Sequence, residues 1–85
     1  MKTKDKISNN LKKFVIKRRA ELELERGEKV LIKDVLLDLS NYCGFDKIDS
    51  INMIYRKVNN PSLYTALKIA KYFDTNVENI FSLKE

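Results

Sequence analysis

The sequence lacks histidine and tryptophan, and it contains only one cysteine, one proline and two glycines among 85 residues. A single cysteine excludes an intramolecular disulfide, and without histidine the usual zinc ligand sets cannot be assembled. So few glycines and prolines indicate few tight turns and a mostly helical chain. Cys43 lies among apolar residues. It is interpreted either as a small buried hydrophobe or as a reactive thiol or dimer cross-link.

The sequence also lacks most of the residues and motifs from which enzyme active sites are built. There is no histidine, no glycine-rich phosphate loop and no nucleophile beside a base. We therefore expect no catalysis, no cofactor and no bound metal. No apolar run reaches the ~18 residues of a membrane span, and the lysine-rich start lacks the apolar stretch of a signal peptide. Together with the unpaired cysteine, this predicts a cytoplasmic protein with no membrane association.

Positive charge is concentrated at the start of the chain. Residues 1–19 hold eight Lys or Arg and one Asp, 8 − 1 = +7, whereas residues 20–28 hold one Arg and four Glu, 1 − 4 = −3. Such a basic head is suited to binding a phosphate backbone with salt-sensitive affinity, although a solvated lysine tail explains it equally well. We divide the chain into a basic flexible arm, residues 1–8, and one small domain, residues 9–85.

Helical spacing begins near Ser8 and Asn9, either of which can cap a first helix. Two apolar stripes follow, one with Leu11, Phe14, Val15 and Leu22, the other with Ile16, Ala20 and Leu24. Gly27 is a natural helix end. Residues 21–25 also alternate as in a strand, which permits a hairpin with residues 30–32. Because an isolated two-stranded ribbon is marginally stable, we favour the helix.

Two further helices are predicted in the middle of the chain. Residues 30–43 carry apolar side chains at helical spacing, and Gly44 closes that element. Asp46 can cap the next helix. Its inward face would consist of Ile48, Ile51, Ile54, Tyr55 and Val58. A rotation of 100° per residue then directs outward Asp49, Asn52, Met53, Arg56 and Lys57.

The last third of the chain contains two helix starts. Asn60 can accept the unpaired amide hydrogens of a first turn, and Pro61 presets φ for the first helical position. The apolar stripe of this fourth helix would be Leu63, Ala66, Leu67, Ala70 and Phe73. Asn76 can cap a short fifth helix, which would return to the core the side chains of Val77, Ile80 and Phe81.

These residues resemble the lambda-repressor-like (Cro/repressor, or XRE-type) helix-turn-helix family. The motifs concerned are Asn60-Pro61-Ser62-Leu63, Ala66-Leu67-Lys68-Ile69-Ala70-Lys71 and Ile80-Phe81-Ser82-Leu83. The resemblance is strongest over residues 59–83. It implies an all-α fold, a compact five-helix bundle containing a helix-turn-helix, here with an extended first helix or an insertion. It also implies a nucleoid-associated protein that binds double-stranded DNA.

The chain departs from the family pattern in the two helices that would contact DNA. Lys33-Asp34 stands where the family has Thr-Gln, and Leu39-Ser40 stands where Leu-Ala is usual. The turn after Gly44 is one residue longer than usual. The predicted DNA contacts are nevertheless Lys33, Lys47, Asp49, Asn52, Met53, Arg56, Lys57 and Asn59.

The chemistry of the outward row suits base readout. Asn52 carries the amide for a bidentate contact with adenine, Arg56 can reach guanine or phosphate, and Met53 can touch a thymine methyl. Asp46 and Asp49 oppose phosphate binding unless they accept from cytosine or cap the helix. An ordinary solvated surface remains the alternative interpretation.

Two functions follow from this pattern. The first is a sequence-specific DNA-binding protein, a repressor-type transcriptional regulator of a bacterium, phage or mobile element, acting as a homodimer because one short helix reads few bases. The second is a protein-interaction module that binds a protein partner, as an antirepressor, antitoxin or accessory protein does. The dimer surface would be the acidic segment of residues 20–29 or the edge formed by Phe81-Ser82-Leu83.

Overall fold

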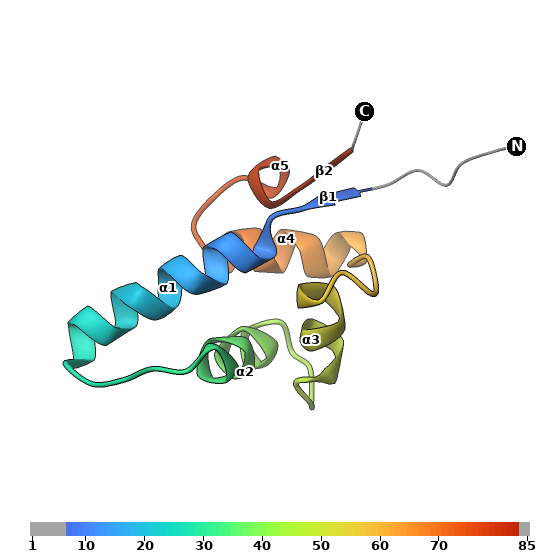
Figure 1. The fold of residues 1–85 in the computed structure, drawn as a ribbon. Helices are drawn as coiled ribbons and strands as arrows, with labels where there is room; N and C mark the ends of the chain where they lie inside the picture. The colour runs from blue at the N-terminus through green and yellow to red at the C-terminus, as the bar shows by residue number, and fades with distance from the viewer. Residues whose placement is uncertain (1–6, 84–85) are drawn as a thin grey trace, which may run out of the picture.

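The computed structural model describes residues 7–83, which form five helices and two short strands (Figure 1). In chain order these are β1 (Ile7–Asn9), α1 (Leu11–Arg26), α2 (Ile32–Tyr42), α3 (Asp49–Tyr55), α4 (Leu63–Tyr72), α5 (Val77–Ile80) and β2 (Phe81–Leu83). The predicted five helices are confirmed within this range. The expectation of an all-α fold was wrong in one respect, because β1 and β2 pair as an antiparallel sheet.

The sheet joins the two ends of the described chain. Ile7 lies opposite Leu83, Ser8 opposite Ser82, and Asn9 opposite Phe81. Strands of three residues are too short for a period of two to stand out, so the sequence does not predict them. Part of the expected arm, Ile7 and Ser8, thus belongs to β1. The rest of that arm, residues 1–6, lies outside the described residues.

Helix α1 is continuous through the acidic segment, as predicted, and the alternative hairpin is not formed. It ends at Gly27, whose φ of 68° suits glycine and whose N–H donates to the Glu23 carbonyl at 2.8 Å. Leu11, Val15 and Leu22 are buried, and the Phe14 ring packs against Phe73 with centroids 5.6 Å apart. The second apolar stripe, in contrast, faces outward.

The hydrophobic core is drawn from every helix. Its fully buried side chains include Leu11, Val15, Val30, Val35, Leu39, Ile51, Ile69 and Ile80. Cys43 is buried among them, which confirms the interpretation as a small apolar residue. Burial raises the pKa of its thiol, an effect that the positive charge of Lys68 partly opposes.

Helix α4 begins later than predicted, and its inner face is only partly the predicted one: Ala66 and Ala70 are buried and Phe73 packs against the core, as expected. Its cap is Ser62 rather than Asn60, since the Ser62 hydroxyl accepts from the Thr65 N–H at 3.1 Å. Leu63, expected in the core, is 74% exposed, and Leu67 is also exposed, whereas Thr65 and Ile69 are buried. Apolar residues occur around most of this helix, so periodicity alone did not select the inner face.

Helix α5 returns to the core as predicted, with Ile80 and Phe81 buried. Asn76 precedes its first residue, although its side chain makes no capping hydrogen bond. Within residues 7–83, no helix combines the length and the apolar composition needed to cross a membrane.

Candidate nucleic-acid interface

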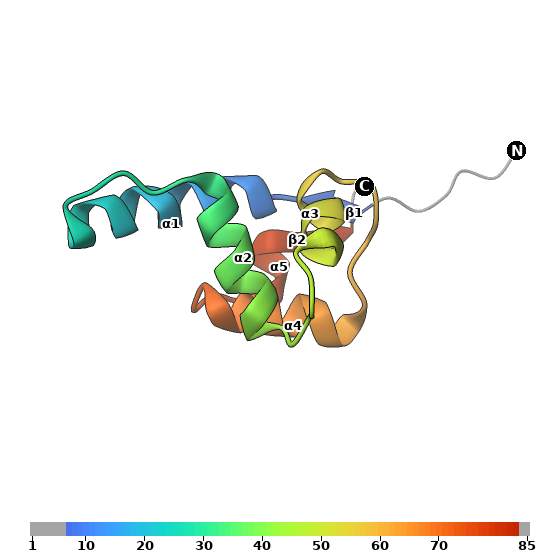
Figure 2. The same cartoon turned by 90° about the horizontal axis from the view of Figure 1, so that it is seen from below.

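Helices α2 and α3 lie together on one side of the molecule, below α1 and α4 in Figure 1 and in front of them in Figure 2. The turn that joins them is held by Ser40, which is 1% exposed and donates its hydroxyl hydrogen to the Lys47 carbonyl at 2.8 Å. Gly44 reverses the chain with a φ of 85°. Because a buried hydroxyl needs a partner, this bond restrains where α3 starts relative to α2.

The inner face of α3 is largely the predicted one. Ile51 and Ile54 are buried, and Ile48 and Tyr55 pack against the core. The prediction that Val58 faces inward was wrong, because Val58 lies beyond the helix and is 54% exposed. The predicted Asp46 cap was also wrong: α3 follows Ile48, and no side chain caps it. Asp46 stands two residues before the cap position, Ile48.

The outward row of α3 has the predicted rotation. Asp49 and Arg56 are exposed, while Asn52 and Met53 are half-buried on the side away from Ile51. Lys57 and Asn59 are exposed just after the helix, Lys47 in the turn before it, and Lys33 in the first turn of α2. The structure therefore brings six of the eight predicted residues onto one helix and the loop that follows it, with Lys33 and Lys47 on the preceding segments.

The end of α3 has a left-handed backbone conformation that was not predicted from the sequence. Lys57 has a φ of 64°, in the left-handed region where glycine is usual. Its N–H donates to the Ile54 carbonyl at 3.0 Å, and the Val58 N–H donates to the Met53 carbonyl at 2.9 Å. These two bonds form a Schellman motif with lysine in place of glycine. The motif turns the chain so that Lys57 and Asn59 follow directly beside the outward row.

A residue that the sequence analysis did not assign to the site, Asn9, holds α3 from the other end of the chain. Its side-chain Nδ2 donates to the Ile54 carbonyl at 2.9 Å, and its Oδ1 accepts from the Leu11 N–H at 2.9 Å. From its place before the first apolar stripe, the sequence predicts for Asn9 only a role as a helix cap. The two partners are 45 positions apart in the sequence, so no local pattern indicates the contact.

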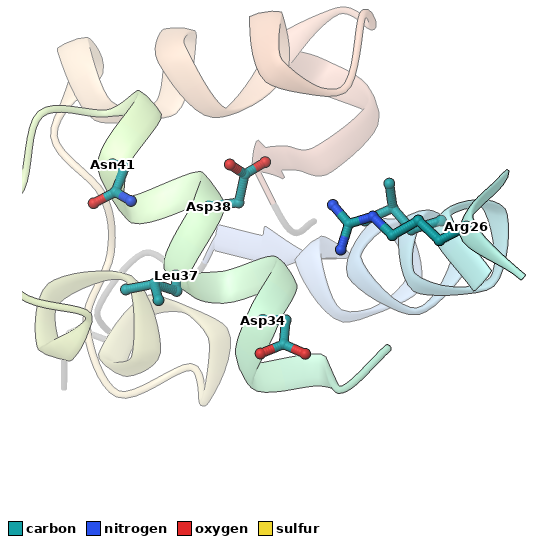
Figure 3. A pocket seen from close by; sticks show the side chains of 6 residues that line it. Arg26, Asp34, Leu37, Asp38 and Asn41 are labelled. Carbon is teal, nitrogen blue, oxygen red and sulfur yellow. The ribbon is translucent and has the colours of Figure 1, made fainter. Parts of the chain in front are cut away.

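A shallow depression of about 280 Å³ lies between α1 and α2, and no residue of α3 contributes to its lining (Figure 3). Its lining includes Arg26, Asp34, Asp38 and Asn41. Both carboxylates already have partners within the fold: Asp34 accepts from the Leu31 N–H at 3.1 Å, and Asp38 accepts from the Tyr72 hydroxyl at 2.6 Å. The Asp34 carboxylate therefore caps the start of α2, and the Asp38 carboxylate joins α2 to α4.

Burial, together with the Asp38 hydrogen bond, raises the pKa of Tyr72 to about 12.

Among residues 7–83, no cluster of three or more His, Cys, Asp or Glu side chains is placed to hold a metal ion. The chain matches no protein-family model, and no curated protein matches it significantly.

Proposed function

We propose that this protein binds double-stranded DNA in a sequence-specific manner, with α2 and α3 acting as the helix-turn-helix of a lambda-repressor-like fold. The observation that carries the proposal is the outward row of α3. Asn52, Met53 and Arg56 share one side of a helix whose other side is anchored in the core by Ile51 and Ile54. An amphipathic helix so anchored, with base-reading side chains outside, is what the major groove accepts.

The chemistry of the row matches the edges of the bases. The Asn52 amide can donate to and accept from adenine, and the Arg56 guanidinium can donate twice to guanine. Met53 offers an apolar contact for a thymine methyl. Lys47 precedes this row and Lys57 follows it, and Lys33 lies in the first turn of α2; all three are exposed and could supply charge for phosphates.

The biological role that follows is transcriptional regulation of the repressor type, in a bacterium, phage or mobile element. Helix α3 has only seven residues, so one copy reads few base pairs. Two copies on half-sites about one helical turn apart double the contacts, which favours a homodimer.

A protein-interaction module is the second candidate, and the acidic residues of α3 favour it. Asp46 and Asp49 are exposed near the start of the helix, where they would repel phosphates. A partner with a basic surface would accept them instead. The two candidates differ in one measurable property, the affinity for DNA at low salt.

The test is a titration of the protein against its own upstream DNA and against an unrelated duplex of equal length. It is run at ~50 and ~200 mM salt, the range over which phosphate-driven binding falls steeply. A preference of ~10³-fold or more for its own region supports an operator-binding protein. Equal, salt-sensitive binding to both duplexes would indicate an accessory DNA-binding role, and absence of binding at low salt would favour the protein partner.

Single substitutions then locate the readout. Asn52→Ala and Arg56→Ala should each reduce the preference for the operator by ~1–3 kcal/mol, because each removes a bidentate base contact. Lys71→Gln, an exposed cation on α4, is the matched control and should leave the preference unchanged. An equal loss in all three variants would contradict a specific role of Asn52 and Arg56 in base readout.

A further inference from the structure

Helix α1 carries an apolar stripe that the core does not use. Ile16 is 44% exposed, Ala20 is exposed, and Leu24, one turn further, is 87% exposed. The three residues stand at i, i+4 and i+8, so they line one side of the helix. Because the buried Leu11, Val15 and Leu22 face the core, this stripe is directed toward solvent along most of the length of α1.

The charges beside this stripe are divided between the two halves of the helix. The first half carries the exposed Lys12, Lys13 and Lys17, and the second half and the residue after its cap carry the exposed Glu21, Glu25 and Glu28 beside the exposed Arg26. Glu21 and Glu25 also lie 3.4 and 3.9 Å from the Arg18 guanidinium of the same chain, in pairs that remain partly exposed to solvent. A shallow depression of about 380 Å³ adjoins the first half, with Ile16 in its lining and further cations at its edge, namely Arg19 and Lys29. One end of the stripe is therefore basic and the other acidic.

We propose that this stripe binds a second copy of the same chain, with the two α1 helices antiparallel and the two-fold axis at Ala20. An isologous contact of this kind requires a surface that complements itself. In the antiparallel register, Ile16 packs beside Leu24 of the second copy. The basic half of each helix then lies against the acidic half of the other.

The register can be followed residue by residue. Lys17 stands three residues before Ala20 and Glu21 one residue after it, so in the antiparallel pair they lie on the same edge with an axial offset of ~3 Å. A parallel pair would instead place lysine against lysine and glutamate against glutamate, which is unfavourable. Charge thus selects the antiparallel arrangement.

This inference goes beyond DNA binding and does not depend on it. The stripe on α1 shares no residue with the outward row of α3, and self-association is measured without DNA. Loss of the α1 dimer would weaken operator binding by halving the contacts but would leave the outward row of each copy intact, and failure to bind DNA would leave self-association measurable, so the two proposals can fail separately.

The experiment is sedimentation equilibrium of the full-length protein over a range of concentrations, at low and high salt. We expect a dimer that weakens as salt rises, because the paired charges are exposed and screened. Leu24→Glu should weaken dimerisation at least ~10-fold, since it replaces an apolar contact by a charge. The matched control is Leu63→Glu on α4, where the leucine is also highly exposed. It should leave the dimer unchanged.

A charge exchange tests the register. Lys17→Glu and Glu21→Lys should each weaken the dimer ~10-fold, because each places like charges together twice in the symmetric pair. The double variant K17E/E21K should recover the wild-type dimerisation, while circular dichroism verifies that every variant is folded. The proposal would be overturned by a monomer up to ~1 mM, by no rescue in the folded double variant, or by a dimer that only Leu63→Glu disrupts.

Discussion

The Asn9 side chain donates to the backbone carbonyl of Ile54 at 2.9 Å and so joins the first strand to the last turn of α3. Asn9 also lies opposite Phe81 in the sheet, and its Oδ1 accepts from the Leu11 N–H. One partly buried amide thus connects β1, the start of α1 and the candidate recognition helix. The last turn of α3 is therefore bonded to a residue of the sheet that joins the two ends of the described chain.

Replacing Asn9 by alanine should destabilise the fold by ~1–3 kcal/mol, because the Ile54 carbonyl and the Leu11 N–H would both lose their partner. The measurement is urea denaturation followed by circular dichroism. Asn10→Ala is the matched control, since its side chain makes only a 3.4 Å exposed bond to the Asn79 carbonyl. Similar losses in both variants would contradict the role assigned to Asn9.

Lys57→Gly should raise stability and lower DNA affinity at the same time. Lysine at a φ of 64° is strained relative to glycine, so the substitution should gain up to ~1 kcal/mol in the free energy of unfolding. It also removes one cation beside the outward row, which should reduce the salt dependence of DNA binding by about one phosphate contact. Denaturation and salt titration measure the two effects. Reduced stability would contradict the role of backbone strain, and an unchanged salt slope would remove Lys57 from the interface.

Ser62→Ala should cost ~1 kcal/mol through loss of the helix cap, whereas Asn60→Ala should cost much less. The Ser62 hydroxyl oxygen accepts a hydrogen bond from the Thr65 N–H, whereas Asn60 is exposed and lies three residues before the first residue of the helix. Thermal denaturation of the two variants separates the cap seen in the structure from the one that the sequence favoured. A larger loss in Asn60→Ala would restore the sequence-based assignment.

Tyr72 should ionise near pH 12 in the folded protein, since burial, and then the bond to the Asp38 carboxylate, raise its pKa from 10 to about 12. A raised folded-state pKa stabilises the neutral phenol, so this contribution is complete below pH 10 and is lost as pH rises toward 12. Ultraviolet phenolate titration should show a step near pH 12 that Tyr72→Phe removes.

Asp38→Asn should shift that step downward, because the substituted amide carries no charge. Tyr64→Phe is the control, since Tyr64 is exposed on α4, and it should leave the high-pH step in place. If the step persists in Tyr72→Phe, the assignment to Tyr72 is wrong.

In the middle of the chain, some features of α2 and α3 could be predicted from the sequence and others could not. The buried Ile51 and Ile54 and the outward Asn52, Met53 and Arg56 were predictable, because a period of 3.6 residues is a property of neighbouring positions. Gly44 likewise signalled the end of α2. The similar end of α3 at Lys57 carried no such signal, since lysine rarely adopts a positive φ.

The sequence by itself determined the five helices, the face of α3 that meets the core and the division of charge along α1, because each arises from residues within a few turns of one another. Tertiary structure alone decided the pairing of β1 with β2, the contact of Asn9 with Ile54 and the inner face of α4. The strands are too short to show a pattern, the Asn9 contact spans 45 residues, and α4 has more apolar residues than its inner face accepts. In each case the choice depends on groups that meet only when the chain has folded.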